Sequence, residues 1–156
     1  MNNNYYDLAE EDLLEAEDRY MVGRYNKCAY WCQQAGEKYL KYVLINKLGI
    51  IDCTVASDHN LKRISDRINR DRKILTIPVS ALFALTNYYT KARYPGEGFV
   101  EVDKNTALEL LKHAKTIKTM VDEYLMSFPL EDELKSLASK FQAKDIDSIS
   151  PGPDKK

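Results

Sequence analysis

The sequence has few cysteines, which could form disulfides, and few glycines and prolines, which break helices and strands. It holds three cysteines, six glycines and five prolines among 156 residues. An odd set of three cysteines argues against a miniature domain stapled by disulfides and fits a reducing compartment. No run approaches the roughly 18 apolar residues of a membrane span, and no apolar signal-like stretch follows Met1. We therefore expect one globular domain that is cytoplasmic and has no membrane association.

Several enzyme motifs are also missing. The one Gly-x-Gly, at Gly96–Gly98, lacks the third glycine and the lysine of a phosphate-binding loop, and no Gly-x-Ser-x-Gly nucleophile elbow occurs. Cys28 and Cys32 lie four residues apart, but no histidine follows at zinc-finger spacing. We predict no metal and no cofactor, and we interpret Cys28 and Cys32 as small buried side chains.

Net charge is small but strongly segregated along the chain. The total is −1, yet residues 1–18 hold seven acids and no base. Residues 19–93 hold 14 basic and five acidic residues, which gives a net charge of +9. Such a basic segment suits a phosphate-bearing ligand. Protein–protein association is the alternative, in which the acidic helix of one copy binds the basic segment of another.

Apolar residues recur at helical spacing through most of the chain, and no alternating strand pattern is found. Helices are predicted over 5–20, 26–48, 58–70, 76–92, 103–127 and, more weakly, 130–141. We therefore predict an all-α, up-and-down bundle of four to five antiparallel helices. Residues 1–128 would form the bundle, 129–142 an additional helix after Pro129, and 143–156 a flexible tail.

The ends of these helices are predicted from capping residues. We assign N-caps to Asn26, to Ser57 or Asp58, and to Asp103, and a C-terminal stop to Gly49. Residues 50–56 are a predicted loop whose β-branched content leaves a weak chance of a short strand.

His59 is the histidine of greatest interest. It falls in the predicted first turn of a basic helix, where free amides and the helix dipole favour an anion. It could contact a phosphate there, or it could simply pack and hold the entry to the helix. His113 lies beside the apolar stripe of the last long helix, and we interpret it as structural.

A row of donors follows one face of the second helix. Gln34, Lys38 and Lys41 are spaced at i, i+4 and i+7, beside a predicted Glu37–Lys41 pair. Such a row can bind phosphates, and a solvated face with ordinary salt bridges explains it equally well. Most of the 11 tyrosines fall on core stripes, which argues against base stacking as their general role.

The junction Ala92-Arg93-Tyr94-Pro95 is the leading candidate site. Arg93 closes a helix, where a cation suits the dipole, and this alone would account for it. An arginine fork, an aromatic ring and a rigid proline in succession also suit a planar, charged ligand. We therefore predict a ligand-binding role for Arg93 and Tyr94.

Four segments in order resemble the prokaryotic HEPN domain family, over roughly Tyr5 to Leu125. They are 33–41 (QQAGEKYLK), 58–61 (DHNL), 88–95 (YYTKARYP) and 107–121. The resemblance implies a four- or five-helix bundle, commonly a homodimer, found in bacteria and archaea beside a minimal nucleotidyltransferase or as a nucleotide-binding module. It also implies a toxin-like ribonuclease in those members that carry an Arg-x4-6-His motif.

That motif is absent from this chain. The nearest arginine before His59 is Arg24, and the nearest before His113 is Arg93. We therefore predict a non-catalytic protein that binds a nucleotide or RNA through Arg93, Tyr94, Lys38, Lys41, Gln34 and His59. The alternatives are a divergent ribonuclease using His59 with Arg93, and a scaffold that binds no nucleotide.

Overall fold

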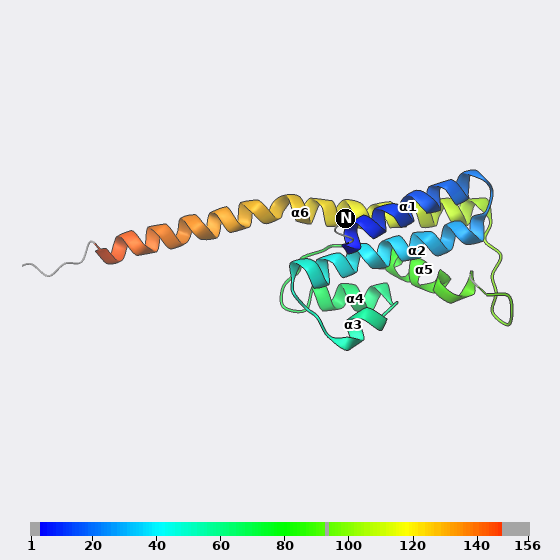
Figure 1. Ribbon diagram of the computed structural model, residues 1–156, viewed down its shortest axis with the longest axis horizontal. Coiled ribbons are helices and arrows are strands. Elements are labelled where there is room, and N and C mark those ends of the chain that lie inside the picture. Colours follow the sequence, from blue (N-terminus) through cyan, green and yellow to red (C-terminus); the bar gives the residue numbers. More distant parts are fainter. Residues whose placement is uncertain (1–3, 93, 148–156) are drawn as a thin grey trace, which may run out of the picture. The chain divides into compact units, whose positions relative to one another are not determined.

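Every regular element in the described part of the chain is a helix. The computed structural model describes residues 4–92 and 94–147. The elements in Figure 1 are α1 (Tyr5–Met21), α2 (Tyr25–Lys41), the π-helix η1 (Tyr42–Lys47), α3 (Cys53–Ser57), α4 (Leu61–Ile68), α5 (Val79–Lys91) and α6 (Lys104–Asp147). The predicted all-α helical fold is confirmed. No helix within the described ranges is both long and apolar enough to cross a membrane.

Helix α2 packs against α1, α4 and α5, because small side chains cover much of its surface. Cys28 and Cys32 are fully buried, as predicted, with their sulfur atoms 3.9 Å apart. Gly36 allows the closest approach, since a β-carbon there would lie 3.1 Å from side-chain atoms of both Leu61 and Ile117. The apolar residues at helical spacing that predicted a helix over 26–48 therefore form its buried side.

The chain leaves α2 through one turn of π-helix. Leu48 N–H donates to Val43 C=O at 3.0 Å, one residue further back than in an α-helix. Gly49 then ends the helical run with a φ of 67°, a left-handed conformation that glycine adopts without steric cost. The predicted stop at Gly49 is confirmed.

Asn26 does not cap α2 as predicted. The helix begins at Tyr25 after Arg24, and Asn26 lies in its first turn. The Asn26 side chain instead donates to Val100 C=O at 2.8 Å and accepts from Val102 N–H at 3.0 Å. It therefore ties the segment before α6 to α2, and this contact across 74 residues displaces the local capping role.

Residues 50–60 differ from the predicted loop and cap. No strand forms over 50–56, because most of this segment belongs to α3. The Asp52 carboxylate caps α3 by accepting from Thr54 N–H and Val55 N–H. The cap of α4 is Asn60, which accepts from Arg63 N–H at 3.0 Å, and not Ser57 or Asp58. Asp58 accepts from Asn60 N–H at 2.9 Å instead, so it shapes the turn that leads to the cap.

Helix α6 begins as predicted and ends later than predicted. Asp103 caps it by accepting from Thr106 N–H at 2.7 Å. The predicted break at Pro129 is wrong, since the helix continues to Asp147 and includes the first residues of the predicted tail. A proline in a helix removes one hydrogen bond at a cost of about 3 kcal/mol, which a long helix can tolerate. Residues 148–156 of that tail lie outside the described residues.

The chain divides within α6 into a unit that ends at Asp122 and a second unit that begins at Glu123. In the first unit, α1 is tied to α6 by polar contacts. Tyr6 donates to Asp122 at 2.6 Å, and Lys118 donates to Glu10 at 2.5 Å while its ammonium lies 5.2 Å from the centre of the Tyr6 ring. Part of the acidic charge of α1 is therefore neutralised within the chain.

Candidate functional site

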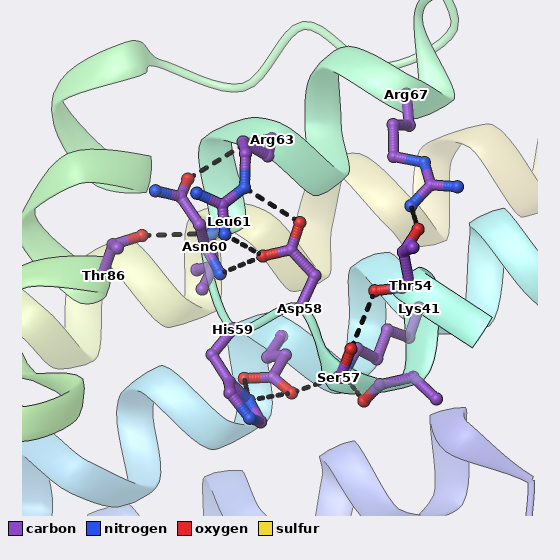
Figure 2. Close-up of polar contacts among 12 residues, drawn as sticks. Lys41, Thr54, Ser57, Asp58, His59, Asn60, Leu61, Arg63, Arg67 and Thr86 are labelled. Atoms are coloured by element: carbon purple, nitrogen blue, oxygen red, sulfur yellow. Dashed lines mark hydrogen bonds and ion pairs between the residues drawn. The ribbon is translucent and has the colours of Figure 1, made fainter. Parts of the chain in front are cut away.

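His59 lies between α3 and α4, next to the Asn60 cap, rather than in the first turn of a helix (Figure 2). Its backbone C=O accepts from the Gln33 side chain at 3.3 Å. Its imidazole Nδ1 lies 3.1 Å from both carboxylate oxygens of Glu37. Because a carboxylate only accepts, this contact places a proton on Nδ1, and Nε2 is the nitrogen left to meet a ligand.

Tyr89 supports the other side of this arrangement. The Tyr89 ring, from α5, stacks on the His59 imidazole with centroids 4.4 Å apart and planes inclined by 15°. The imidazole is held by α2 through Glu37 and by α5 through Tyr89, yet 41% of the His59 side chain is exposed. An oriented, accessible imidazole of this kind can contact a bound anion or exchange a proton with a ligand.

Glu37 is the buried centre of the cluster. Its carboxylate accepts from Gln33 at 2.9 Å and from Lys41 at 2.7 Å, in addition to His59. The Lys41 ammonium also donates to Ala56 C=O at 3.0 Å, which links α2 to α3. The predicted Glu37–Lys41 pair is confirmed, but it is buried rather than solvated, and it fixes the carboxylate that orients His59.

The predicted donor row on α2 is not a single exposed row. Lys41 is buried against Glu37. Lys38 instead binds Asp12 on α1, where burial raises the pKa of the Asp12 carboxyl above its ordinary value although the Lys38 hydrogen bond lowers it. Gln34 donates to Gln33 at 2.6 Å. All three donors therefore hold partners within the chain, and their predicted role in ligand binding stays a prediction.

The predicted junction site is described only in part, because Arg93 lies outside the described residues. Tyr94 is 59% exposed. It lines a surface hollow of about 380 Å³ with Lys91, Pro95, Gly96, Glu97, Gly98 and Phe99. Val100 N–H donates to Lys91 C=O at 3.0 Å and closes this turn. The hollow lies at the end of α5, two residues beyond Tyr89 in the sequence.

The basic segment is largely internally paired where it forms α4. Arg63 donates to Asp58 through two nitrogens, at 2.7 and 3.0 Å, and this hydrogen bonding lowers the pKa of the Asp58 carboxyl below its ordinary value although partial burial raises it (Figure 2). Arg67 binds Asp52 and donates to Thr54 at 3.0 Å. These pairs border a surface hollow of about 660 Å³, so Arg63 and Arg67, two of the three arginines that line it, already have anionic partners.

Sequence reasoning identified His59 but missed the residues that orient it. Glu37 was predicted only to pair with Lys41, and Tyr89 only to lie in the helix over 76–92. Both lie in the segments that carried the family resemblance, which was the available signal. Within the ranges 4–92 and 94–147, no three His, Cys, Asp or Glu side chains gather as a metal site would require.

These features define an all-helical bundle with an oriented imidazole where α2, α5 and the turn before α4 meet. The chain belongs to the HEPN domain family, whose model matches residues 3–124. The crystal structure of TT1696 from Thermus thermophilus is similar, with a TM-score of 0.63, 25% sequence identity and coverage of 77% of this chain and 94% of that chain. No curated protein matches.

Proposed function

We propose that this HEPN domain protein binds a nucleotide or a nucleic acid and does not cleave it. The observation that supports this proposal is the His59 imidazole, held by Glu37 and stacked on Tyr89 while 41% of it stays exposed. When protonated, its Nε2 can donate to a phosphate, and aromatic rings beside such a donor suit a nucleobase. Arg93 and Tyr94, after α5 in the sequence, would complete the site.

The absence of cleavage is proposed from the surroundings of His59. Among the described residues, no arginine hydrogen-bonds to it, and the sequence lacks an arginine at Arg-x4-6-His spacing. Transition-state stabilisation of a phosphate needs a fixed cation or donor beside the base. Without an arginine at that spacing, the oriented imidazole supports contact with a ligand better than it supports catalysis.

Titration of ATP, GTP and a short labelled RNA by fluorescence anisotropy or calorimetry tests the binding proposal. We expect at least one of these ligands to bind the wild type and to bind His59→Ala and Arg93→Ala more weakly. His113→Ala is the matched control, since it removes the other histidine of the chain. Absence of binding to all three ligands, or equal binding by all four proteins, would refute the proposal.

A second candidate is a divergent ribonuclease, and the Glu37–His59 contact is the observation that favours it. A neutral imidazole with its proton on Nδ1 presents Nε2 as an acceptor, which is how a general base takes a proton from a 2′-hydroxyl. Long incubation of purified protein with RNA separates the two candidates. RNA cleavage lost in His59→Ala and kept in His113→Ala would replace the binding proposal with this one.

We further propose that the protein works as a homodimer beside a minimal nucleotidyltransferase, as the family resemblance implies. Co-expression with a nucleotidyltransferase encoded in an adjacent reading frame tests the partnership, and the two proteins should elute together. Separate elution at micromolar concentration would count against it.

The scaffold alternative depends on the acidic charge of the first helix being available to another protein. Part of that charge is already used, because Glu10 and Asp12 of α1 pair with Lys118 and Lys38 in the same chain.

A further inference from the structure

Helix α6 continues well beyond the part of the chain that the HEPN family model matches. The match ends at residue 124, whereas α6 runs to Asp147. The helical residues after 124 therefore form an addition to the family's domain, called here the α6 extension (residues 125–147). This addition involves none of the residues in the proposed ligand site.

The α6 extension carries a row of exposed apolar side chains. Leu134, Leu137 and Phe141 are 65%, 49% and 68% exposed. Their spacing of three and then four residues places them on one face of the helix, as in the a and d positions of a coiled coil. Large apolar side chains aligned on an exposed helix face are typical of a surface that another helix covers.

We propose that the α6 extensions of two copies of this chain pair antiparallel through the row formed by Leu134, Leu137 and Phe141. In this arrangement Leu134 of one copy faces Leu137 of the other. The sequence is acidic at 131–133 and basic at 140 and 144. Antiparallel pairing brings the acidic positions of one copy opposite position 140 of the other, whereas parallel pairing would place the two acidic runs side by side. Charge complementarity therefore favours a second copy in this orientation.

Disulfide cross-linking of the full-length chain tests the arrangement directly. Cys53 is exposed and would be changed to serine, while Cys28 and Cys32 are buried and stay. In that background, Leu134→Cys and Leu137→Cys are expressed separately and together, and then oxidised. We expect a covalent dimer when the two variants are co-expressed and little or none in either variant alone. Cross-linking within each single variant would indicate parallel pairing, and no cross-linking in any sample would exclude pairing; either result overturns the proposal.

A mass measurement provides the second test. Light scattering over a dilution series should show that Leu134→Asp combined with Leu137→Asp makes the assembly dissociate at a higher protein concentration than the wild type does, because one of its contacts is lost whether or not the first unit also dimerises. Lys135→Gln is the matched control, because Lys135 is exposed on the same helix and lies outside the row. A dilution profile of the double variant that equals that of the wild type, or an equal change in the control, would contradict the proposal. Binding of nucleotide by His59 is untouched by either outcome.

Discussion

The Lys41 ammonium and the Glu37 carboxylate lie 2.7 Å apart, and only 3% and 7% of their side chains are exposed. Each charge therefore depends on hydrogen-bond partners rather than on water. Lys41 has a further acceptor in Ala56 C=O, and Glu37 has further donors in Gln33 and His59. The pair thus joins α2 to α3 and fixes the imidazole of the candidate site.

Removal of one partner of this pair should be costly. We expect Lys41→Met to lower the free energy of unfolding by about 3 kcal/mol, because a buried carboxylate loses its counter-charge. Urea denaturation followed by circular dichroism measures the change. Adding Glu37→Gln to Lys41→Met should restore part of the loss, since the buried charge is then removed.

Lys112→Met is the control for this experiment. Lys112 pairs with Glu109 at 2.8 Å, but both side chains are about 60% exposed. An exposed pair of this kind contributes at most about 1 kcal/mol. Equal losses in Lys41→Met and Lys112→Met would mean that burial of the Glu37–Lys41 pair does not govern its contribution.

Local pattern in the sequence was sufficient for most of the helices. The helical spacing of apolar residues over 26–48, the Asp103 cap and the Gly49 stop each depend on residues within a few positions of one another, and all three are found. Helical periodicity also predicted that Glu37 and Lys41 would pair. It could not show that α3 covers this pair, because α3 was read as a loop.

One error and one omission arose where a distant contact overrides local preference. Asn26 is a good capping residue, but its amide meets the backbone at 100 and 102, which no local pattern reveals. The orientation of His59 depends likewise on Glu37, 22 residues earlier, and on Tyr89, 30 residues later. Three segments meet at this imidazole, so only the folded chain shows the site.

The contacts of Asn26 give a second stability prediction. Asn26→Ala removes both hydrogen bonds to the segment before α6, so we expect a loss of about 1–2 kcal/mol in the free energy of unfolding. Asn26→Asp keeps the acceptor for Val102 N–H and loses the donor to Val100 C=O. Its free energy of unfolding should therefore lie between that of the wild type and that of Asn26→Ala. Asn87→Ala, at an exposed position of α5, is the control. If Asn26→Ala unfolds at the same urea concentration as the wild type, these bonds do not stabilise the fold.

The Asp58–Arg63 pair gives a prediction about pH. Its hydrogen bonds hold the pKa of Asp58 below its ordinary value in the folded chain. The folded state therefore binds this proton less readily than the unfolded state, and the pair stabilises the fold above the unfolded pKa of about 3.9. That stabilisation is lost as pH falls from the unfolded pKa through the folded one.

Urea unfolding at a series of pH values measures this loss. Between about pH 5 and pH 2 the wild type should lose more stability than Asp58→Asn, because the variant has no proton to bind at this position. Asp66→Asn is the control, since the Asp66 side chain is 59% exposed and pairs only with Lys62 among the described residues. Parallel pH profiles for the wild type and Asp58→Asn would contradict the prediction.

The stack of Tyr89 on His59 gives a prediction about binding. If the proposed ligand contacts His59, Tyr89→Leu should weaken its binding about threefold to tenfold, because a stacked aromatic pair contributes about 0.5–1.5 kcal/mol. Tyr89→Phe should bind as the wild type does, since it keeps the ring and loses only the hydroxyl. The measurement is the titration of RNA, ATP and GTP described above.

Tyr88→Leu is the control, because it changes the neighbouring ring and should leave the affinity unchanged. A loss of affinity in Tyr89→Phe as large as that in Tyr89→Leu would assign the effect to the hydroxyl. Unchanged affinity in Tyr89→Leu would show that ligand binding by His59 does not depend on the stacked ring.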